Sequence, residues 1–228
     1  MLRFEGVLLA RGDFRLSADF ALDGPGLTAV IGPSGGGKST LLSLVGGFEL
    51  PDAGRVLWRG DDLGPKPPGE RPVAVLFQDN NLFPHLDVLT NVALGAAPTA
   101  RPSPEVIARA RAALDRVGLA GFEDRLPAAL SGGQQSRAAL ARCLLTDREV
   151  ILMDEAFAAL GPALRAEMLG LVGELLDGRT ILMVTHDPAD AENVAERTIF
   201  VDDGNVHAPV ATSELFAYPH AALARYLA

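Results

Sequence analysis

The segment GPSGGGKST, residues 32–40, has the residue types and spacing that bind the phosphates of a nucleotide. It fits the pattern G-x-x-x-x-G-K-[ST], follows an apolar stretch at 27–31 and opens another at 38–48. Glycines let the backbone curl so that successive N–H groups face phosphate oxygens, and a helix N-terminus favours the same anion. We therefore expect ATP-binding residues at Gly32, Pro33, Ser34, Gly35, Gly36, Gly37, Lys38, Ser39 and Thr40.

The side chains that end this segment have separate expected roles. Lys38 would reach the β and γ phosphates, the Ser39 hydroxyl is placed for Mg²⁺, and Thr40 would add a further phosphate contact. The alternative is a glycine-rich turn with an incidental lysine, which would leave the strand and helix signals on either side unexplained.

Two other patterns overlap this region. Residues 32–36 also fit the nucleophile elbow G-x-S-x-G, with Ser34 as nucleophile and with Asp154 and His186 as formal partners of a hydrolase triad. This hydrolase interpretation is the second choice, because lysine and serine follow the elbow directly. The stretch 24–29 resembles a dinucleotide fingerprint, but it precedes a strand instead of following one, which excludes it.

Two carboxylates, Asp154 and Glu155, follow the apolar stretch 150–153. Open α/β folds place ligand chemistry at the carboxyl ends of buried parallel strands, so this position favours a role beside the phosphate segment. We expect Asp154 to hold Mg²⁺, through water, and Glu155 to orient or deprotonate the attacking water. The alternative is a pair of carboxylates that only ends a strand.

Two further polar residues follow strand-like stretches. Gln78 comes after 73–77 and His186 after 180–185. Gln78 is expected to contact the metal and the water, and His186 to contact the γ-phosphate. Each side chain by itself would more often be simply solvated.

A second anion-binding helix start is indicated at LSGGQ, residues 130–134. A serine N-cap and two glycines begin a helix that should run to about Leu145, and the residues concerned are Ser131, Gly132, Gly133 and Gln134. One ATP needs only one phosphate segment, so a second such terminus suggests a nucleotide held between two copies of the chain.

The elements that must position these residues are indicated by apolar periodicity and by turn residues. The strands are expected at 2–9, 14–22, 27–31, 54–58, 73–77, 150–154 and 180–185, with a surface loop at 61–72 and a hairpin from 199–202 to 205–208. Helices are expected at 38–48, from Ser103 and Pro104 to about 117, and at 131–145, 162–176 and 188–195. Alternating strands and helices predict a parallel sheet, with a helical lobe at about 79–145 inserted into it.

Composition limits the class of protein. The 228 residues, 48% of them hydrophobic and 21% charged, suffice for one globular domain, and the net charge of −9 argues against general nucleic-acid binding. The single cysteine, Cys143, cannot pair within the chain, and we identify neither a leader nor a stretch of spanning length, so a cytoplasmic setting is expected.

Taken in order, residues 32–40, Gln78, 130–134, 150–155 and His186 resemble the nucleotide-binding subunits of ATP-binding-cassette transporters, over nearly the whole chain. The resemblance implies an α/β fold with a P-loop NTPase core, an N-terminal antiparallel β subdomain and an inserted helical subdomain, all within one domain of 228 residues. It also implies a head-to-tail homodimer that binds ATP and Mg²⁺. Further implied partners are transmembrane permease subunits at the cytoplasmic face of the bacterial inner membrane and, indirectly, a periplasmic solute-binding protein.

Within that family, residues 70–86 and 161–169 are most similar to the ATPase subunits of bacterial thiamine importers. The lack of an extra domain after the hairpin agrees, because importers of sugars, sulfate and polyamines usually carry one. The alternatives are import of ferric iron or another small solute, and a soluble cassette ATPase, which would typically have a coiled-coil insert or tandem cassettes.

The chain departs from the family pattern at two places. Residues 158–161 read Ala-Ala-Leu-Gly where the family usually has Ser-Ala-Leu-Asp, so an interfacial aspartate is missing at Gly161. The aromatic residue that stacks on adenine is also missing around 10–13; Phe14 is the nearest candidate, and an ordinary strand residue is an equal alternative.

Overall fold

The computed structural model describes residues 1–99 and 101–227. The chain forms two compact units, one made of residues 1–73 with the segment from 178 onward, the other of residues 74–177. The second unit contains the predicted helical lobe at 79–145 together with two strands and a further helix. Within the described ranges, no helix combines the length and apolar character needed to cross a membrane.

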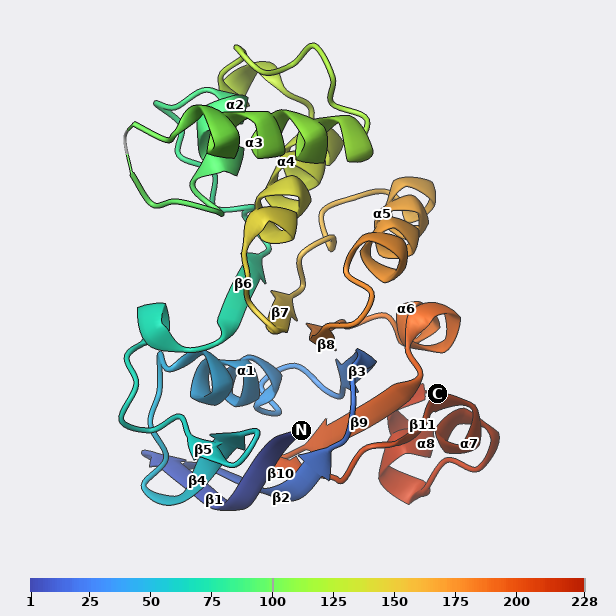
Figure 1. The fold of residues 1–228 in the computed structure, drawn as a ribbon. Coiled ribbons are helices and arrows are strands. Elements are labelled where there is room, and N and C mark those ends of the chain that lie inside the picture. The colour runs from blue at the N-terminus through green and yellow to red at the C-terminus, as the bar shows by residue number, and fades with distance from the viewer. Residues whose placement is uncertain (100, 228) are drawn as a thin grey trace. The chain divides into compact units, whose positions relative to one another are not determined.

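The first unit contains most of the strands (Figure 1). Their bounds are β1 Leu2–Arg11, β2 Phe14–Leu22, β3 Gly26–Ile31, β4 Ala53–Trp58, β5 Asp61–Asp62, β8 Thr180–Val184, β9 Arg197–Asp202, β10 Asn205–Val206 and β11 Val210–Ala211. They follow the order β5-β4-β1-β2-β10-β9-β3-β8, and β11 pairs with β9. Pairing of β1 with β2 and β4 is antiparallel, whereas β3 pairs in parallel with β8 and β9. This arrangement confirms the expected antiparallel N-terminal part and parallel core.

Burial of the strands follows their position in the sheet. In β1, buried and exposed residues alternate over much of the strand, as expected for an antiparallel strand with one face in water. All residues of β8 and all but the first of β3 are buried, as expected for parallel strands covered on both faces. The apolar stretches 27–31 and 180–184 therefore form the core that carries the loops at their carboxyl ends.

Helix α1, Lys38–Gly46, follows the glycine-rich segment and is two residues shorter than the sequence predicted. It ends at Gly47, whose φ of 84° is left-handed and whose N–H donates to the carbonyl of Ser43. The N–H of Phe48 donates to the same carbonyl at 3.0 Å. Glycine at this position allows the chain to turn away without a Cβ penalty.

A buried arginine completes the C-terminal end of α1. Arg71 is 1% exposed, and its guanidinium donates to the carbonyls of Leu44 at 2.7 Å, Val45 at 3.0 Å and Lys66 at 2.9 Å. Carbonyls at a helix C-terminus have no partner within the helix, and a cation there also offsets the helix dipole. Burial lowers the pKa of Arg71 below its usual value. The stretch 61–72, predicted as a loop, also contains β5 and the short 3₁₀ helix Pro68–Glu70.

The C-terminal part of the first unit contains three helices, α6 Pro188–Val194, α7 Thr212–Ala217 and α8 Ala221–Leu227. Only α6 was predicted from the sequence. The hairpin between β9 and β10 was also predicted, and its turn residues Asp203 and Gly204 have φ angles of 46° and 73°. A Cβ at Gly204 would lie 1.7 Å from the carbonyl oxygen of Arg15, so this turn position must be glycine.

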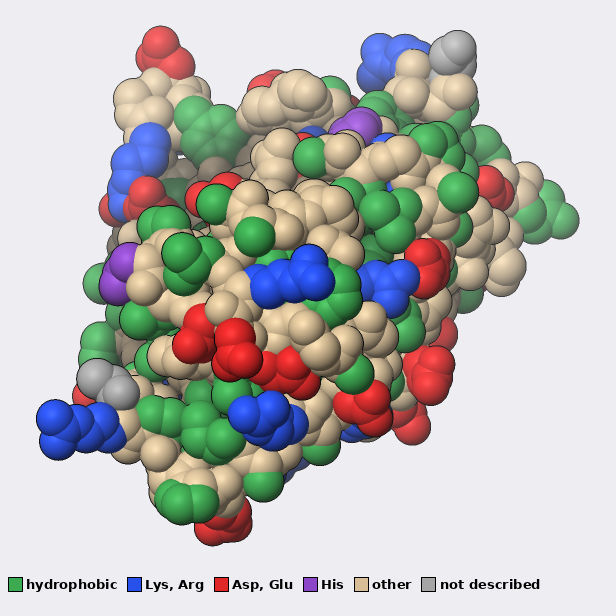
Figure 2. Space-filling view, turned by 90° about the horizontal axis from the view of Figure 1, so that it is seen from above, with side chains coloured by type: hydrophobic (Ala, Val, Ile, Leu, Met, Phe, Trp, Pro, Cys, Tyr) green, Lys and Arg blue, Asp and Glu red, His purple; other side chains and the backbone are tan. Residues whose placement is uncertain are grey.

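The second unit contains the remaining elements. They are β6 Val73–Phe77, which starts at its boundary, α2 Val88–Ala93, α3 Pro104–Arg116, the 3₁₀ helix Pro127–Ala129, α4 Gly132–Leu145, β7 Val150–Asp154 and α5 Pro162–Leu175. Helices α2, α3 and α4 pack against one another, and β6 lies next to β7 in the strand order. The predicted start of α3 is confirmed, because the Ser103 hydroxyl accepts from the N–H of Val106 at 3.3 Å. On the face drawn in Figure 2, acidic, basic and hydrophobic side chains are interspersed.

Two histidines stack beside the buried ring of Phe200 in β9. The rings of His207 and His220 lie 5.1 Å apart, and each also contacts Phe200. Burial, and then the proximity of His220, hold the pKa of His207 below its usual 6.5, whereas Asp202 acts in the opposite direction. The folded state therefore favours neutral His207.

This environment predicts a pH-dependent stability. Neutral His207 contributes fully to the free energy of unfolding above pH 6.5. This contribution is lost as the pH falls through the lower pKa that His207 has in the folded state. We expect the unfolding midpoint of His207→Phe to fall less than that of the wild type between pH 7.5 and pH 5.5. The exposed His85 is the control, and His85→Phe should retain the wild-type dependence. Equal pH dependence in all three proteins would contradict the assignment.

Candidate nucleotide-binding site

The phosphate-binding segment connects β3 to α1 and is shaped by glycines. Gly32, Gly35 and Gly37 have φ angles of 144°, 76° and 111°. A Cβ at Gly32 would lie 2.0 Å from the carbonyl oxygen of Val201 in β9, so this approach is open only to glycine. A Cβ at Gly35 would meet nothing within 4 Å, so the backbone there is open to a ligand. The geometry fits a loop that surrounds a phosphate.

Lys38 lies at the start of α1 and is 8% exposed. Its Nζ donates to the carbonyls of Gly32 at 2.8 Å and Pro33 at 2.9 Å, which holds the ammonium group over the loop. The N-cap of α1 is Gly37, which has no side chain to occupy the helix terminus. A helix N-terminus with a lysine beside it fits an anionic phosphate group.

Phe14, the candidate for adenine stacking, lies against this loop. A Cβ on Gly37 would approach the tip of the Phe14 ring and the Leu16 methyl group at 3.0 Å each. Phe14 is half-buried, and its ring leaves little room for a side chain at position 37. Adenine stacking by Phe14 remains a prediction.

His186 is placed near the same edge of the first unit's sheet. Strands β3 and β8 run parallel with Val30 opposite Val184, and the N–H of Thr185 donates to the carbonyl of Val30 at 3.3 Å. The phosphate loop and the exposed His186 therefore follow the same ends of adjacent strands. A shared role of these two elements in one site remains a prediction.

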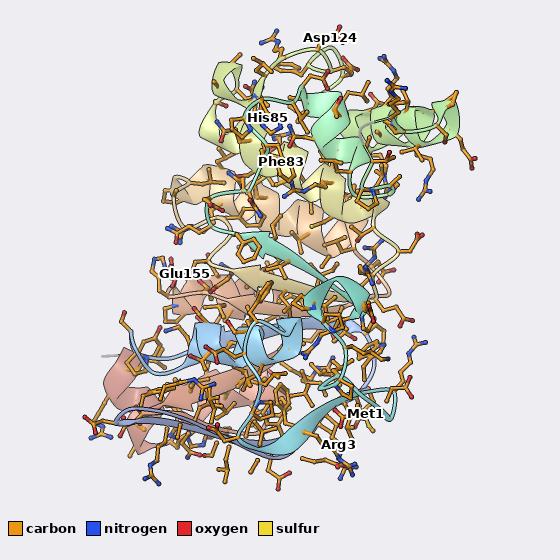
Figure 3. The ribbon with its side chains drawn as sticks, turned by 90° about the vertical axis from the view of Figure 1, so that its left-hand side faces the viewer. Met1, Arg3, Phe83, His85, Asp124 and Glu155 are labelled. Atoms are coloured by element: carbon orange, nitrogen blue, oxygen red, sulfur yellow. The ribbon has the colours of Figure 1, made fainter. Side chains whose placement is uncertain are left out.

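Asp154 and Glu155 lie at the end of β7 in the second unit. Residues 150–153 are buried, and Asp154 is half-buried. Glu155, labelled in Figure 3, has a left-handed φ of 49°. A left-handed conformation costs a residue with a Cβ about 1 to 2 kcal/mol and occurs preferentially at functional sites. Ser34 is not among the described non-glycine residues with positive φ, so the strained turn of a nucleophile elbow is absent there.

Gln78 follows β6, the strand next to β7, and begins a turn with an uncommon conformation. Asn80 and Asn81 have consecutive left-handed φ angles of 58° and 46°. Arg142 of α4 donates to both of their carbonyls, at 3.0 Å to Asn80 and 2.8 Å to Asn81. Burial lowers the pKa of Arg142 below its usual value. Sequence reasoning missed Arg142, because its partners are backbone atoms about 60 residues away.

The contact predicts that arginine is needed at position 142. A guanidinium presents its donors in a fixed fork, which an ammonium group cannot reproduce. We expect Arg142→Lys to lower kcat for ATP hydrolysis about five- to tenfold, because the Gln78 loop loses its support. Arg109→Lys, on an exposed side chain of α3, is the control. Wild-type kcat in Arg142→Lys would mean that the loop is held by other contacts.

The start of α4 is a reciprocal cap. The Ser131 hydroxyl accepts from the N–H of Gln134 at 3.4 Å, and Oε1 of Gln134 accepts from the N–H of Ser131 at 2.9 Å. A Cβ at Gly133 would lie 2.4 Å from a methyl group of Leu164 in α5, whereas Gly132 has open space. The predicted N-cap is confirmed. The cap also assigns Gln134 a structural bond that was not predicted from the sequence.

The predicted Mg²⁺ ligands, Ser39, Gln78 and Asp154, all have oxygen atoms in their side chains. Ser39 lies in the first turn of α1, whereas Gln78 and Asp154 follow or end β6 and β7. A hydroxyl, an amide oxygen and a carboxylate suit the preference of Mg²⁺ for oxygen. The chemistry of this set fits the ion.

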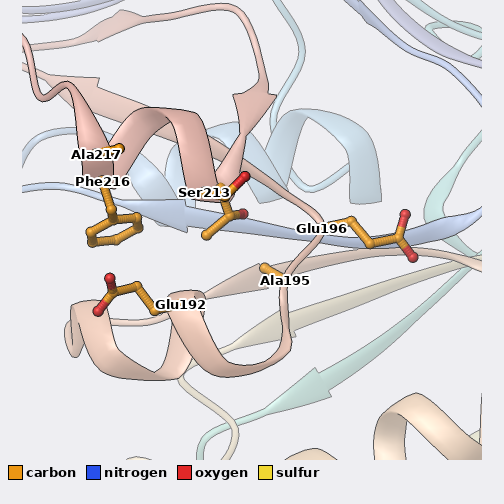
Figure 4. Close-up of a pocket in the computed structure, with 7 residues that line it drawn as sticks. Glu192, Ala195, Glu196, Ser213, Phe216 and Ala217 are labelled. Atoms are coloured by element: carbon orange, nitrogen blue, oxygen red, sulfur yellow. The ribbon is translucent and has the colours of Figure 1, made fainter.

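A separate pocket of about 630 Å³ lies between α6 and α7 (Figure 4). Glu192 and Phe216 line it from these two helices, and none of its lining residues belongs to the predicted site. It therefore has no part in the nucleotide chemistry considered above.

Comparisons with known proteins agree with this geometry. Residues 17–158 match the family model described as ABC transporter. The chain is 56% identical over 229 residues to the thiamine import ATP-binding protein ThiQ of Cereibacter sphaeroides, covering 100% of this chain and 99% of that protein. It is 48% identical over 218 residues to ThiQ of Mesorhizobium japonicum, covering 95% and 86%.

Two solved structures have the same fold. CbiO1 of Clostridium perfringens, part of the ABC transporter complex CbiONQ, superposes with a TM-score of 0.83 at 28% identity, covering 95% of this chain and 90% of that one. The dimeric ATP-binding cassette MJ0796, in a post-hydrolysis state bound to ADP and Pi, gives a TM-score of 0.76 at 30% identity, covering 93% and 99%.

Proposed function

Because the chain belongs to the ABC transporter family, we propose that it is the ATP-hydrolysing subunit of an importer for thiamine or thiamine phosphates. The observation that supports thiamine as the substrate is the 56% identity to a thiamine import ATP-binding protein over the whole of this chain. An ATPase subunit need not touch the transported solute, so this similarity, and not the nucleotide site, supports thiamine.

In this proposal the residues have distinct chemical roles. The backbone of 32–37 and the first turn of α1 bind the phosphates, and Lys38 exchanges its contacts with loop carbonyls for phosphate oxygens. Ser39, Gln78 and Asp154 would hold Mg²⁺, which offsets phosphate charge when bound. Glu155 orients or deprotonates the attacking water, and His186 contacts the γ-phosphate.

The second helix start at Ser131, Gly132, Gly133 and Gln134 is assigned to the ATP bound by the other copy of a homodimer. Ser131 and Gly132 are exposed, which leaves this terminus accessible to a second chain. The dimeric cassette MJ0796, bound to ADP and Pi, supports the formation of a dimer. ATP binding would close the dimer and hydrolysis would open it.

The membrane subunits are assigned to the surface that follows the Gln78 loop. Phe83 is 45% exposed, and its ring contacts His85 at a centroid distance of 6.0 Å (Figure 3). Leu126 of the same unit is 49% exposed. The proposal assigns these two exposed apolar side chains to the contact with the membrane subunits. With this surface, the ATPase subunit would bind the membrane subunits from the cytoplasmic face of the inner membrane. A periplasmic solute-binding protein would be an indirect partner.

Uptake of labelled thiamine tests the function and the substrate together. Cells of the source organism that lack this chain are complemented with the wild type or with Glu155→Gln, and only the wild type should restore uptake. If neither protein changes thiamine uptake while Glu155→Gln still loses ATP hydrolysis, the thiamine assignment is wrong and the ATPase assignment stands. Labelled ferric iron and other small solutes would then be the next substrates to measure.

The missing aspartate at Gly161 predicts weaker communication between the two ATP sites. Gly161 is the N-cap of α5 with φ −64° and no side-chain cap, and a Cβ there would meet nothing within 4 Å. Gly161→Asp therefore fits without strain, should cap α5, and is expected to raise the cooperativity of ATP hydrolysis. Gly161→Asn can cap α5 but has no charge, so it separates the effect of the helix cap from the effect of the carboxylate. Unchanged cooperativity in Gly161→Asp would refute the prediction.

A further inference from the structure

The C-terminal helix α8 contacts the loop that carries His186. The hydroxyl of Tyr226 donates to the backbone carbonyl of His186 at 3.2 Å. These residues are 40 positions apart in sequence, and both belong to the first unit. The contact connects α8, which has no predicted role in the nucleotide site, to His186, which is predicted to contact the γ-phosphate.

Helix α8 is anchored in the core of the first unit, so Tyr226 has a fixed base. Leu223 is fully buried, and its N–H faces Nδ1 of His220 at 3.4 Å. The ring of Tyr226 lies 5.9 Å from that of Phe200, which is 1% exposed in β9. His220 packs on the same phenylalanine with a centroid distance of 5.2 Å. These contacts hold the Tyr226 ring independently of its hydroxyl group.

Hydrogen bonds of the neighbouring residues also hold the backbone around His186. The N–H of Asp187 donates to Oγ1 of Thr185 at 3.1 Å, and that hydroxyl donates to Oδ2 of Asp190 at 2.8 Å. The side chain of His186, in contrast, is exposed. The main chain of this loop is therefore restrained on both flanks, while the imidazole stays accessible to a ligand.

We propose that Tyr226 is a positioning residue for ATP hydrolysis, and that the segment 220–227 is a strap that fixes the His186 backbone. The inference rests on the proposed role of His186 at the γ-phosphate. His186 would contact the phosphoryl group that is transferred. Its orientation should therefore affect the activation barrier for hydrolysis more than the affinity for ATP in the ground state. Loss of the tyrosine hydroxyl should consequently affect kcat and leave KM for ATP nearly unchanged.

The test is Tyr226→Phe in the full chain, which removes the hydroxyl and keeps the ring on Phe200. The matched control is Tyr218→Phe, because Tyr218 is the other of the two tyrosines in the sequence and is 83% exposed. We expect Tyr226→Phe to lower kcat about three- to tenfold, the range of one hydrogen bond, with KM for ATP within about twofold. Hydrogen–deuterium exchange in the peptide spanning 180–190 should become faster, and the thermal midpoint should stay within about 2 °C.

Several outcomes would overturn the strap. Wild-type kcat in Tyr226→Phe would do so, as would a loss of kcat that Tyr218→Phe reproduces or that only accompanies a lower thermal midpoint. Unchanged exchange in 180–190 would also contradict it. His186→Ala is measured in parallel: if this variant hydrolyses ATP like the wild type, the proposed role of His186 is wrong, whatever Tyr226→Phe does.

Discussion

Glu155→Gln is expected to lower the rate of ATP hydrolysis about a hundredfold or more, while ATP affinity stays within about threefold. Glutamine has nearly the same shape but cannot accept a proton from water. It also keeps the left-handed backbone at φ 49°, so the loop after β7 should not relax. Because the phosphate-binding loop is untouched, the variant should accumulate as an ATP-bound dimer, which size-exclusion chromatography with ATP can detect.

The matched control for this result is Lys38→Ala. Lys38 contacts the carbonyls of Gly32 and Pro33 at the phosphate-binding loop, so its loss should weaken ATP binding itself and prevent the ATP-dependent dimer. The two variants would then fail at different steps, one at the reaction and one at binding. If Glu155→Gln hydrolysed ATP at the wild-type rate, the assignment of Glu155 as the general base would be wrong.

Arg71→Met is expected to destabilise the protein by about 3 kcal/mol. The variant leaves the carbonyls of Leu44, Val45 and Lys66 without the donors that they have now, two of them at the C-terminal end of α1. Methionine fills part of the volume but offers no N–H group. For a chain of this size, the loss corresponds to a fall of about 6 to 12 °C in the thermal midpoint, measured by calorimetry.

An exposed arginine serves as the comparison for Arg71. Arg55 in β4 pairs with Glu5 at 2.8 Å on the surface, where ion pairs contribute little to stability. Arg55→Met should therefore leave the thermal midpoint close to that of the wild type. If Arg71→Met behaved in the same way, its bonds to the helix end would not contribute to stability.

The sequence predicted the features whose causes are local. The N-cap at Ser131, the glycines of 32–37 and the turn at 203–204 depend on residues next to one another, and each is present in the structure. The motif at 150–155 also predicted a buried strand, because an apolar run of that length has few alternatives. The family resemblance is confirmed by the match over residues 17–158.

The features that were missed depend on contacts between distant segments. Arg71, Arg142 and Tyr226 all donate to backbone carbonyls, which are present in every residue and leave no pattern in the sequence. Helices α7 and α8 are 6 and 7 residues long. Helices this short have too few turns for a clear apolar period and depend on packing for their stability.

Gly204 is far along the chain from the phosphate-binding loop, yet its N–H donates to the carbonyl of Gly36 in that loop at 2.9 Å. Its lack of a side chain also lets the turn lie close to the backbone of Arg15. In a survey of every single substitution scored by growth, this position should therefore tolerate as little change as the loop itself. A map of intolerant positions would then outline the backbone that supports the nucleotide, and not only the side chains that touch it.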